Sequence, residues 1–249
     1  MTDAPRSRTS ARQAIENAAI TQFESRPRDT GVRKTGKPVA ESHEPAPTRE
    51  WIVVIPVKGT DDAKSRLGDS AHRAAIALAI ALDTATAALA ADSVIGVLVV
   101  TSASAATFFD ELDVLVVVED EPAGLAAAIA SGIELAAELG APGRGTAVLL
   151  GDLPALTAHE LEAALEAATA HPLAMVPDAD GSGSVLVTAV DGAVHATAFG
   201  EGSHAAHLAA GYVELQVPVD SGLRNDVDTE EQLRALLPRL GPHTAALDF

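Results

Sequence analysis

Short apolar runs alternate with longer helical segments from residue 51 onward, and this alternation limits the fold more than any other feature. The first run, Trp51–Val57, is continuous and bounded by a Pro and a Gly, as in a strand buried on both faces. Similar runs are Val94–Thr101, Val114–Val118 and Thr146–Leu150, with helical segments at 71–91, 104–112 and 124–139. The alternation predicts an α/β domain in which a mostly parallel sheet carries helices on both faces.

The second half of the chain continues the pattern with clear start signals. Thr157-Ala-His-Glu160 and Thr229-Glu-Glu-Gln232 are capping boxes, which predict that helices begin there. Further strands are expected at 173–177, 184–190 and 212–217, and a short helix at 203–210. We therefore expect a single domain over residues 51–249. Residues 1–50 mix Pro, Ser, Thr, Arg and Glu without a sustained apolar period, which predicts a flexible, disordered tail.

The charge of the domain excludes one class of partner. The chain has a net charge of −18, and residues 51–249 hold 8 of its 17 basic and 28 of its 35 acidic residues, a net of −20. Such a domain repels nucleic acid, so no DNA or RNA partner is expected. Three of the eight cations, Lys58, Lys64 and Arg66, lie in one loop. Cations gathered in this way in an acidic domain indicate an anionic ligand.

Composition also bears on the compartment. The chain has no cysteine, so it has neither disulfides nor a thiolate metal site. Its longest apolar stretch, Ala74–Ala91, is mostly alanine and carries Asp83, which argues against a membrane span. We expect a soluble cytoplasmic protein without a membrane partner. The sequence does not determine the oligomeric state, and a homodimer is compatible with it.

The segments that could carry the chemistry contain either cations or carboxylates. In parallel sheets, ligands bind just beyond the carboxyl ends of the strands. Residues 58–66 lead from the first strand toward a helix near Ser70, and their cations suit a polyphosphate. Asp152 comes just after the fourth strand, and carboxylates in such places bind Mg²⁺ together with substrate phosphates. Asp226 and Asp228 project to the same side of an extended segment, as a two-carboxylate cation site requires.

Two Gly- and Ser-containing segments remain, Asp178–Ser184 and Phe199–Ser203, which together offer N–H and hydroxyl donors for an anion. Taken singly, each is typical of an ordinary turn. His204 and His207 lie three residues apart, but surface or core histidines are commoner than metal ligands, and no zinc motif is present.

In chain order these segments resemble a known family. The motifs are Val57-Lys58 with Lys64-Ser-Arg66-Leu67, Gly151-Asp152-Leu-Pro-Ala-Leu156, Gly181-Ser-Gly-Ser184, Phe199-Gly-Glu-Gly-Ser203 with His207, and Leu223-Arg-Asn-Asp226-Val-Asp228-Thr229. Together they are similar to the phosphoenolpyruvate and 2-phospho-L-lactate guanylyltransferases of coenzyme F-420 biosynthesis. The resemblance covers about residues 51–243, and it implies a single-domain, three-layer fold like that of the nucleotide-diphospho-sugar transferases and molybdopterin nucleotidyltransferases.

The resemblance also implies roles for individual residues. Lys58, Lys64 and Arg66 match the catalytic loop that binds the GTP phosphates. Asp152, Asp226 and Asp228 match the Mg²⁺ ligands, and Ser184, Gly200 and Ser203 match positions that hold phosphoenolpyruvate. The implied partners are therefore GTP and a phosphorylated three-carbon acid.

Two departures from the family and several alternatives remain. Family members often have Gly-Leu-Asn where this chain has Gly124-Leu125-Ala126, so guanine selection can differ, and Gly-Thr-Gly-Thr is here Gly181-Ser-Gly-Ser184. The acceptor could also be 2-phospho-L-lactate or a phosphoglycerate. A molybdopterin guanylyltransferase is disfavoured because the first loop is Val57-Lys58-Gly59, without that family's glycine-rich sequence. A catalytically silent nucleotide-binding module is the alternative from a different class.

Overall fold

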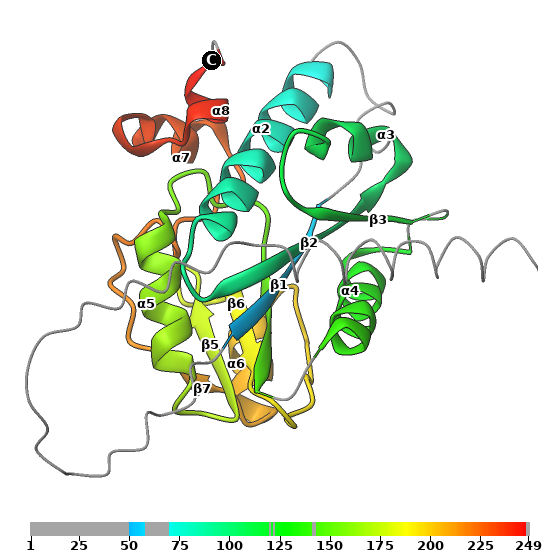
Figure 1. The fold of residues 1–249 in the computed structure, drawn as a ribbon. Coiled ribbons are helices and arrows are strands. Elements are labelled where there is room, and N and C mark those ends of the chain that lie inside the picture. The colour runs from blue at the N-terminus through cyan, green and yellow to red at the C-terminus, as the bar shows by residue number, and fades with distance from the viewer. Residues whose placement is uncertain (1–49, 58–69, 120, 122, 141–142, 248–249) are drawn as a thin grey trace, which may run out of the picture. The chain divides into compact units, whose positions relative to one another are not determined.

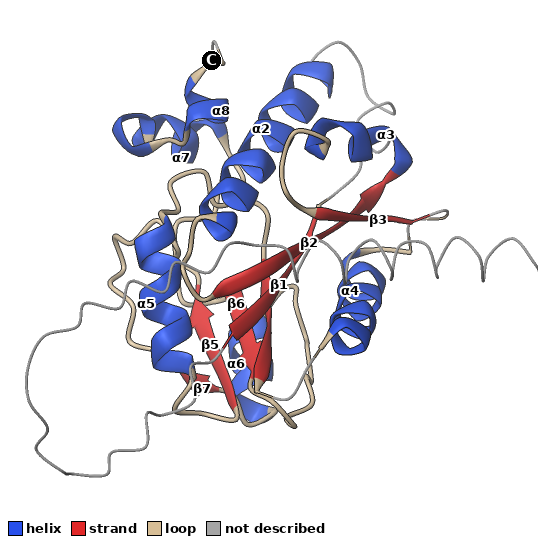
Figure 2. Ribbon diagram, viewed as in Figure 1, coloured by secondary structure: helices blue, strands red, loops and turns tan. Residues whose placement is uncertain are grey.

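A seven-stranded sheet forms the centre of the chain in the computed structural model, which describes residues 50–57, 70–119, 121, 123–140 and 143–247 (Figures 1 and 2). Its strands are β1 (Glu50–Pro56), β2 (Val94–Ser102), β3 (Leu115–Glu119), β4 (Arg144–Leu149), β5 (Leu173–Pro177), β6 (Ser184–Ala189) and β7 (Val213–Glu214). They lie in the order β3-β2-β1-β4-β6-β5-β7. Only β6 runs against its neighbours, β4 and β5, so the expectation of a mostly parallel sheet is confirmed.

Helices cover both faces of this sheet. They are α2 (Ser70–Leu89), α3 (Ala103–Ala106), α4 (Leu125–Leu139), α5 (Ala158–Ala168), α6 (Ser203–Ala209), α7 (Glu230–Ala235) and α8 (Pro242–Ala245), with 3-10 turns η2 (Thr107–Phe109) and η3 (Leu237–Arg239). Helices α2 and α5 pack on each other and on the sheet, whereas α4 packs on β1, β2 and β4 from the opposite side (Figure 1). The domain therefore has the expected three layers.

Strand β1 lies in the middle of the core. Each residue from Trp51 to Ile55 is at most 1% exposed, which explains why the run lacks polar alternation. Trp51 and its alternate residues join the core cluster shared with α2 and α5. On the other face, a Cβ at Gly132 of α4 would overlap the side chain of Val54. A helix glycine here lets α4 approach β1 closely.

Helix α2 is long and apolar enough, by length and composition, to cross a membrane between His72 and Leu89. In this fold it is a core helix, since half of that window is buried against the rest of the domain. Its acidic residue Asp83 is 4% exposed, and its carboxylate accepts hydrogen bonds from the backbone N–H groups of His243 (2.9 Å) and Thr244 (2.8 Å). Asp83 therefore fixes the first turn of α8 to α2.

Asp83→Ala is expected to lower the free energy of unfolding by about 3 kcal/mol, because two N–H groups in the first turn of α8 would lose a charged acceptor. Chemical denaturation followed by circular dichroism measures this loss. Asp92→Ala is the matched control, because Asp92 is exposed just beyond the same helix. An equal effect of both changes would contradict the role given to Asp83.

Two elements of the structure are shorter than the sequence predicted. The helix expected at 104–112 is a single turn of α-helix, Ala103–Ala106, followed by the 3-10 turn η2. The strand expected at 212–217 has only the two residues of β7, because the Val217 N–H turns back to the carbonyl of Leu215 (3.0 Å). Both capping boxes are present and begin α5 and α7 as predicted. Of the expected tail, only Glu50 falls within the described residues, and it begins β1.

Candidate active site

A cavity of about 620 Å³ opens where β1 and β4 end. Pro56 and Val57 line it from β1, and Leu150, Gly151 and Asp152 line it from the segment after β4. The other walls are described residues of α2, α7 and the segment before α7, together with Leu125 at the start of α4. The position agrees with the general rule that ligands of open α/β sheets bind beyond the carboxyl ends of the strands.

Two of the predicted carboxylates line this cavity. Asp152 and Asp228 come from distant parts of the chain, and the Val227 N–H donates to the backbone carbonyl of Asp152 at 3.0 Å. One carboxylate oxygen of Asp152 is buried. Asp228 does not cap α7, because Thr229 is the N-cap and accepts from the Gln232 N–H. The fold thus brings the segment that carries Asp152 and the segment that carries Asp228 together.

Asp226, the third predicted carboxylate, is not among the residues that line this cavity; it is partly buried and lies near other carboxylates. Burial raises its pKa, and the charges of Asp178, Asp228 and Asp180 raise it further. A bound cation would offset both effects, so the electrostatics of this carboxylate fit a divalent metal site. Within the described residues, no group of three His, Cys, Asp or Glu side chains could hold a metal by itself. Mg²⁺ commonly completes its shell with water and substrate phosphates, so this finding is compatible with such a site.

Glu160 of α5 holds the segment that carries Asp226 and Asp228. Its Oε1 accepts hydrogen bonds from the Ser221 hydroxyl (2.9 Å) and the Gly222 N–H (2.8 Å), while Oε2 accepts from Thr157. Burial opposes the charged form, but hydrogen bonds from Thr157, Gly222 and Ser221 hold the pKa of Glu160 below its ordinary value. The residue predicted only as half of a capping box therefore also positions the acidic segment.

Gly222 lets this segment lie against the segment after β4. A Cβ at Gly222 would overlap the carbonyl oxygen of Ala155, three residues after Asp152. Close approach at Gly222 and the Val227–Asp152 hydrogen bond together fix the spacing of the two carboxylate segments.

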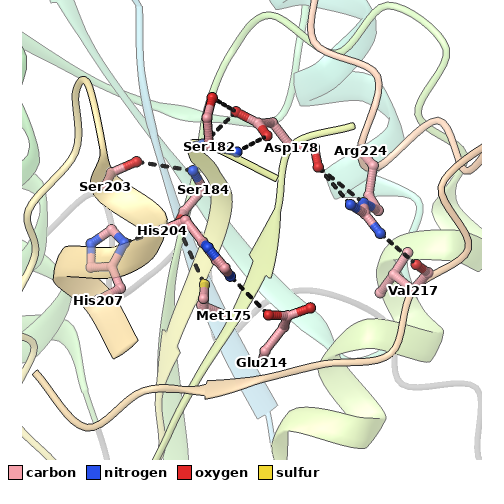
Figure 3. A network of polar contacts seen from close by, with 11 residues as sticks. Met175, Asp178, Ser182, Ser184, Ser203, His204, His207, Glu214, Val217 and Arg224 are labelled. Carbon is pink, nitrogen blue, oxygen red and sulfur yellow. Dashed lines mark hydrogen bonds and ion pairs between the residues drawn. The ribbon is translucent and has the colours of Figure 1, made fainter. Parts of the chain in front are cut away.

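Arg224 connects the acidic segment to the turn between β5 and β6. Its guanidinium donates to the carbonyl of Asp178 through Nε (3.2 Å) and Nη2 (2.7 Å), and to the carbonyl of Val217 through Nη1 (3.1 Å) (Figure 3). The Asp178 carboxylate in turn accepts from the N–H groups of Ser182 (3.0 Å) and Gly183 (2.6 Å). Arg224 therefore has a structural role: it holds the acidic segment against the turn between β5 and β6.

The three residues matched to the acceptor lie together at the start of β6 and α6. The Ser184 N–H donates to the Ser203 hydroxyl at 3.0 Å (Figure 3), and the Ser203 N–H donates to the Gly200 carbonyl at 3.1 Å. Gly200 has a φ of 127°, which side chains other than hydrogen rarely allow. Both serines are buried, with 3% and 2% exposure.

The predicted phosphate loop, with Lys58, Lys64 and Arg66, lies outside the described residues. The described chain adds a cation that the sequence did not single out, Arg73 in the first turns of α2, which lines the cavity. Among the arginines that the structure describes, it is the one without a hydrogen bond or ion pair to the protein. Leu125 lines the same cavity, and Ala126, which replaces the family's usual Asn, is exposed next to it.

Similarity to known proteins identifies the family of this chain. The model of the MobA-like NTP transferase domain matches residues 65–214, more than half of the chain. The chain belongs to this family. Curated relatives share more of its length: phosphoenolpyruvate guanylyltransferase from Streptomyces coelicolor is 44% identical over 203 residues, covering 80% of this chain and 95% of the relative. The protein of the same name from Streptomyces avermitilis is 45% identical over 204 residues, covering 79% and 93%.

These relatives confirm the resemblance read from the motifs, and the chain is a nucleotidyltransferase of the phosphoenolpyruvate guanylyltransferase family. Among solved structures, a protein described as a nucleotide-diphospho-sugar transferase from Desulfovibrio desulfuricans superposes with a TM-score of 0.57 at 16% identity. The match covers 78% of this chain and 92% of that chain. It confirms the predicted fold.

Proposed function

We propose that the protein transfers GMP from GTP to the phosphate of phosphoenolpyruvate, giving enolpyruvoyl-diphospho-5′-guanosine and pyrophosphate in coenzyme F-420 biosynthesis. The observation that carries the proposal is the likeness to phosphoenolpyruvate guanylyltransferases over nearly their whole length. The cavity supports it, because it combines carboxylates with an arginine at the carboxyl ends of the strands. Because a nucleoside triphosphate is the donor, we infer a cytoplasmic location.

The proposed chemistry requires no general base. A phosphate oxygen of the acceptor attacks the α-phosphorus of GTP, and the bond from that phosphorus to the oxygen bridging to the β-phosphate breaks. The attacking phosphate is largely ionised at neutral pH because its second pKa is about 6. What the chain must supply is alignment of two anions and relief of their repulsion.

The site residues then have distinct tasks. Asp152, Asp226 and Asp228 would hold Mg²⁺, which when bound neutralises phosphate charge and orients the attacking and leaving oxygens. The raised pKa of Asp226 supports this assignment, since a cation would relieve the crowding of Asp178, Asp180 and Asp228. Lys58, Lys64 and Arg66 would bind the triphosphate and stabilise the departing pyrophosphate. Ser184, Gly200 and Ser203 would hold the acceptor.

The test is the purified full chain with GTP, Mg²⁺ and each acid in turn: phosphoenolpyruvate, 2-phospho-L-lactate and 3-phosphoglycerate. Pyrophosphate release and the mass of the product report the reaction, and a chelator should stop it. We expect the highest kcat/KM with phosphoenolpyruvate. A higher value with another acid would move the proposal to that acceptor, and no release with any acid would favour the silent nucleotide-binding module.

Arg73 is expected to contribute to binding of the triphosphate of GTP. Arg73→Gln should raise the KM for GTP about 10-fold or more, because a charge-assisted bond to phosphate is lost, and should leave the KM for the acceptor unchanged. Initial rates at varied GTP concentration measure the effect. Arg144→Gln is the control, because Arg144 pairs with Glu50 at 3.1 Å at the opposite edge of the sheet. An unaltered KM for GTP in Arg73→Gln would contradict this role.

A further inference from the structure

His207 of α6 is a buried histidine that joins two segments of the proposed acceptor site. It is 0% exposed. Its Nδ1 lies 3.0 Å from the Ser184 hydroxyl at the start of β6, and its Nε2 accepts a hydrogen bond from the Ala198 N–H at 2.9 Å (Figure 3 draws the first contact). Ala198 precedes Phe199 and Gly200, so one imidazole connects β6 to the segment that leads into α6.

The partners of the ring determine its protonation. A backbone N–H can only donate, so Nε2 carries no hydrogen and a neutral ring has its hydrogen on Nδ1. Nδ1–H therefore donates to Ser184 Oγ. Burial lowers the pKa of His207, and the charge of His204 lowers it further, which agrees with the neutral ring that the Ala198 hydrogen bond requires. Phe199 and Tyr212 contact the imidazole edge-on, with ring centroids 5.1 Å away in both cases, and keep it from rotating.

This orientation determines what Ser184 can offer to a ligand. The Ser184 Oγ already accepts a hydrogen bond from His207. The same hydroxyl donates to the sulfur of Met175, with 3.4 Å between Oγ and Sδ. A thioether is a weak acceptor, and an anionic oxygen is a much stronger one. The hydroxyl hydrogen is thus the part of Ser184 that can be redirected to an anion, while the Ser184 N–H stays on Ser203.

We propose that His207 is a positioning residue for the acceptor: it fixes Ser184 as a donor and holds the 198–203 segment beside it, so that Ser184, Gly200 and Ser203 act as one anion site. The ligand class is the phosphate or carboxylate of the phosphorylated three-carbon acid. The inference rests on the proposed function, which gives these three residues to the acceptor. It adds a residue that does not itself touch the substrate.

The experiment compares substitutions that remove one or both hydrogen bonds. His207→Phe removes both and should raise the KM for phosphoenolpyruvate about 10-fold or more, with the KM for GTP within about twofold of the unchanged protein. His207→Asn keeps a donor near Nδ1, and His207→Gln keeps an acceptor near Nε2. Each should recover part of the loss.

His195→Phe is the matched control for the stability cost of losing a buried histidine. His195 also makes two hydrogen bonds, to the Tyr212 hydroxyl (3.2 Å) and the Thr146 carbonyl (3.1 Å), and burial lowers its pKa to about 4. It contacts none of the three acceptor residues through these bonds. We expect a similar loss of Tm in the two Phe variants but a raised acceptor KM only in His207→Phe.

The possible results separate this inference from the proposed function. If the unchanged protein turns over and His207→Phe keeps its acceptor KM, or His195→Phe raises it equally, the positioning role is wrong and the proposed function stands. If the unchanged protein neither releases pyrophosphate nor binds phosphoenolpyruvate by calorimetry, the proposed function fails and His207 has no acceptor to position.

Discussion

Asp152→Asn is expected to reduce GTP-dependent pyrophosphate release about 100-fold or more, because the cavity loses one of the carboxylate charges that we propose hold the divalent cation. The substitution keeps the shape of the side chain, and the Val227–Asp152 hydrogen bond uses only the backbone carbonyl. The fold should therefore remain. Single-turnover rates with saturating GTP and acceptor measure the loss, and raised Mg²⁺ should restore part of it.

Asp92→Asn provides the control for Asp152→Asn, since this exposed carboxylate lies beyond the end of α2. Its rates should match those of the unchanged protein. Full turnover by Asp152→Asn with an unchanged Mg²⁺ dependence would show that the metal assignment is wrong.

Gly222→Ala is the second substitution expected to lower kcat strongly, and it does so at a distance from the reacting atoms. Its added Cβ would overlap the Ala155 carbonyl oxygen, so the segment with Asp226 and Asp228 must move away from the segment with Asp152. Misplacement of catalytic groups by about 1 Å can cost about 100-fold in rate, and overpacking costs about 1–3 kcal/mol of stability. We expect kcat to fall about 100-fold while most of the fold is retained, as measured by initial rates and circular dichroism.

Gly140→Ala tests whether any added methyl group would do the same. Gly140 follows α4, has a φ of −67°, and its nearest contact to a new Cβ is 3.2 Å. Its rates should stay near those of the unchanged protein. Equal rates for the two variants would mean that the spacing of the carboxylate segments does not limit turnover.

Much of the fold was predictable because local signals and tertiary packing agree. The apolar run Trp51–Val57 predicts a buried strand, and β1 is an internal strand of the sheet, between β2 and β4. The capping boxes at Thr157 and Thr229 form because the side chains that cap the helices are adjacent in sequence. The six residues between β5 and β6 also agree with the reversed direction of β6, since a parallel connection needs a longer crossover.

The errors in the fold arise where neighbouring residues compete with the pattern. The apolar and helical composition of 104–112 predicted a full helix, but Thr107, Phe108 and Phe109 are poor helix formers and the chain tightens there into a 3-10 turn. Tyr212 and Leu215 are buried, but their spacing of three residues does not fit the two-residue alternation of a half-buried strand. Tyr212, however, directs its hydroxyl to Ala196 and His195 rather than extending a sheet face.

The site was predictable only where its residues carry a chemical signal of their own. Asp152, just after β4, and Asp228, in the segment before α7, are carboxylates whose placement points to a cation, and both line the cavity. Glu160, His207 and Arg73 have no such signal. Glu160 and His207 act through partners far away in sequence, Ser221 and Ser184, and Arg73 lines the cavity because α2 forms one of its walls.

The reversed strand β6 has a consequence for how such an enzyme can diversify. Because β6 opposes its neighbours, its first residue, Ser184, lies at the sheet edge where β4 and β5 end. Residues 178–183 and 190–202 are the connections on either side of this strand, and neither lines the cavity that contains Asp152. With the acceptor site proposed above, insertions or exchanges in these two connections would alter the choice of acceptor without changing the lining of the cavity that contains Asp152. New acceptors for the same transfer reaction would then arise from changes in the two connections that flank β6.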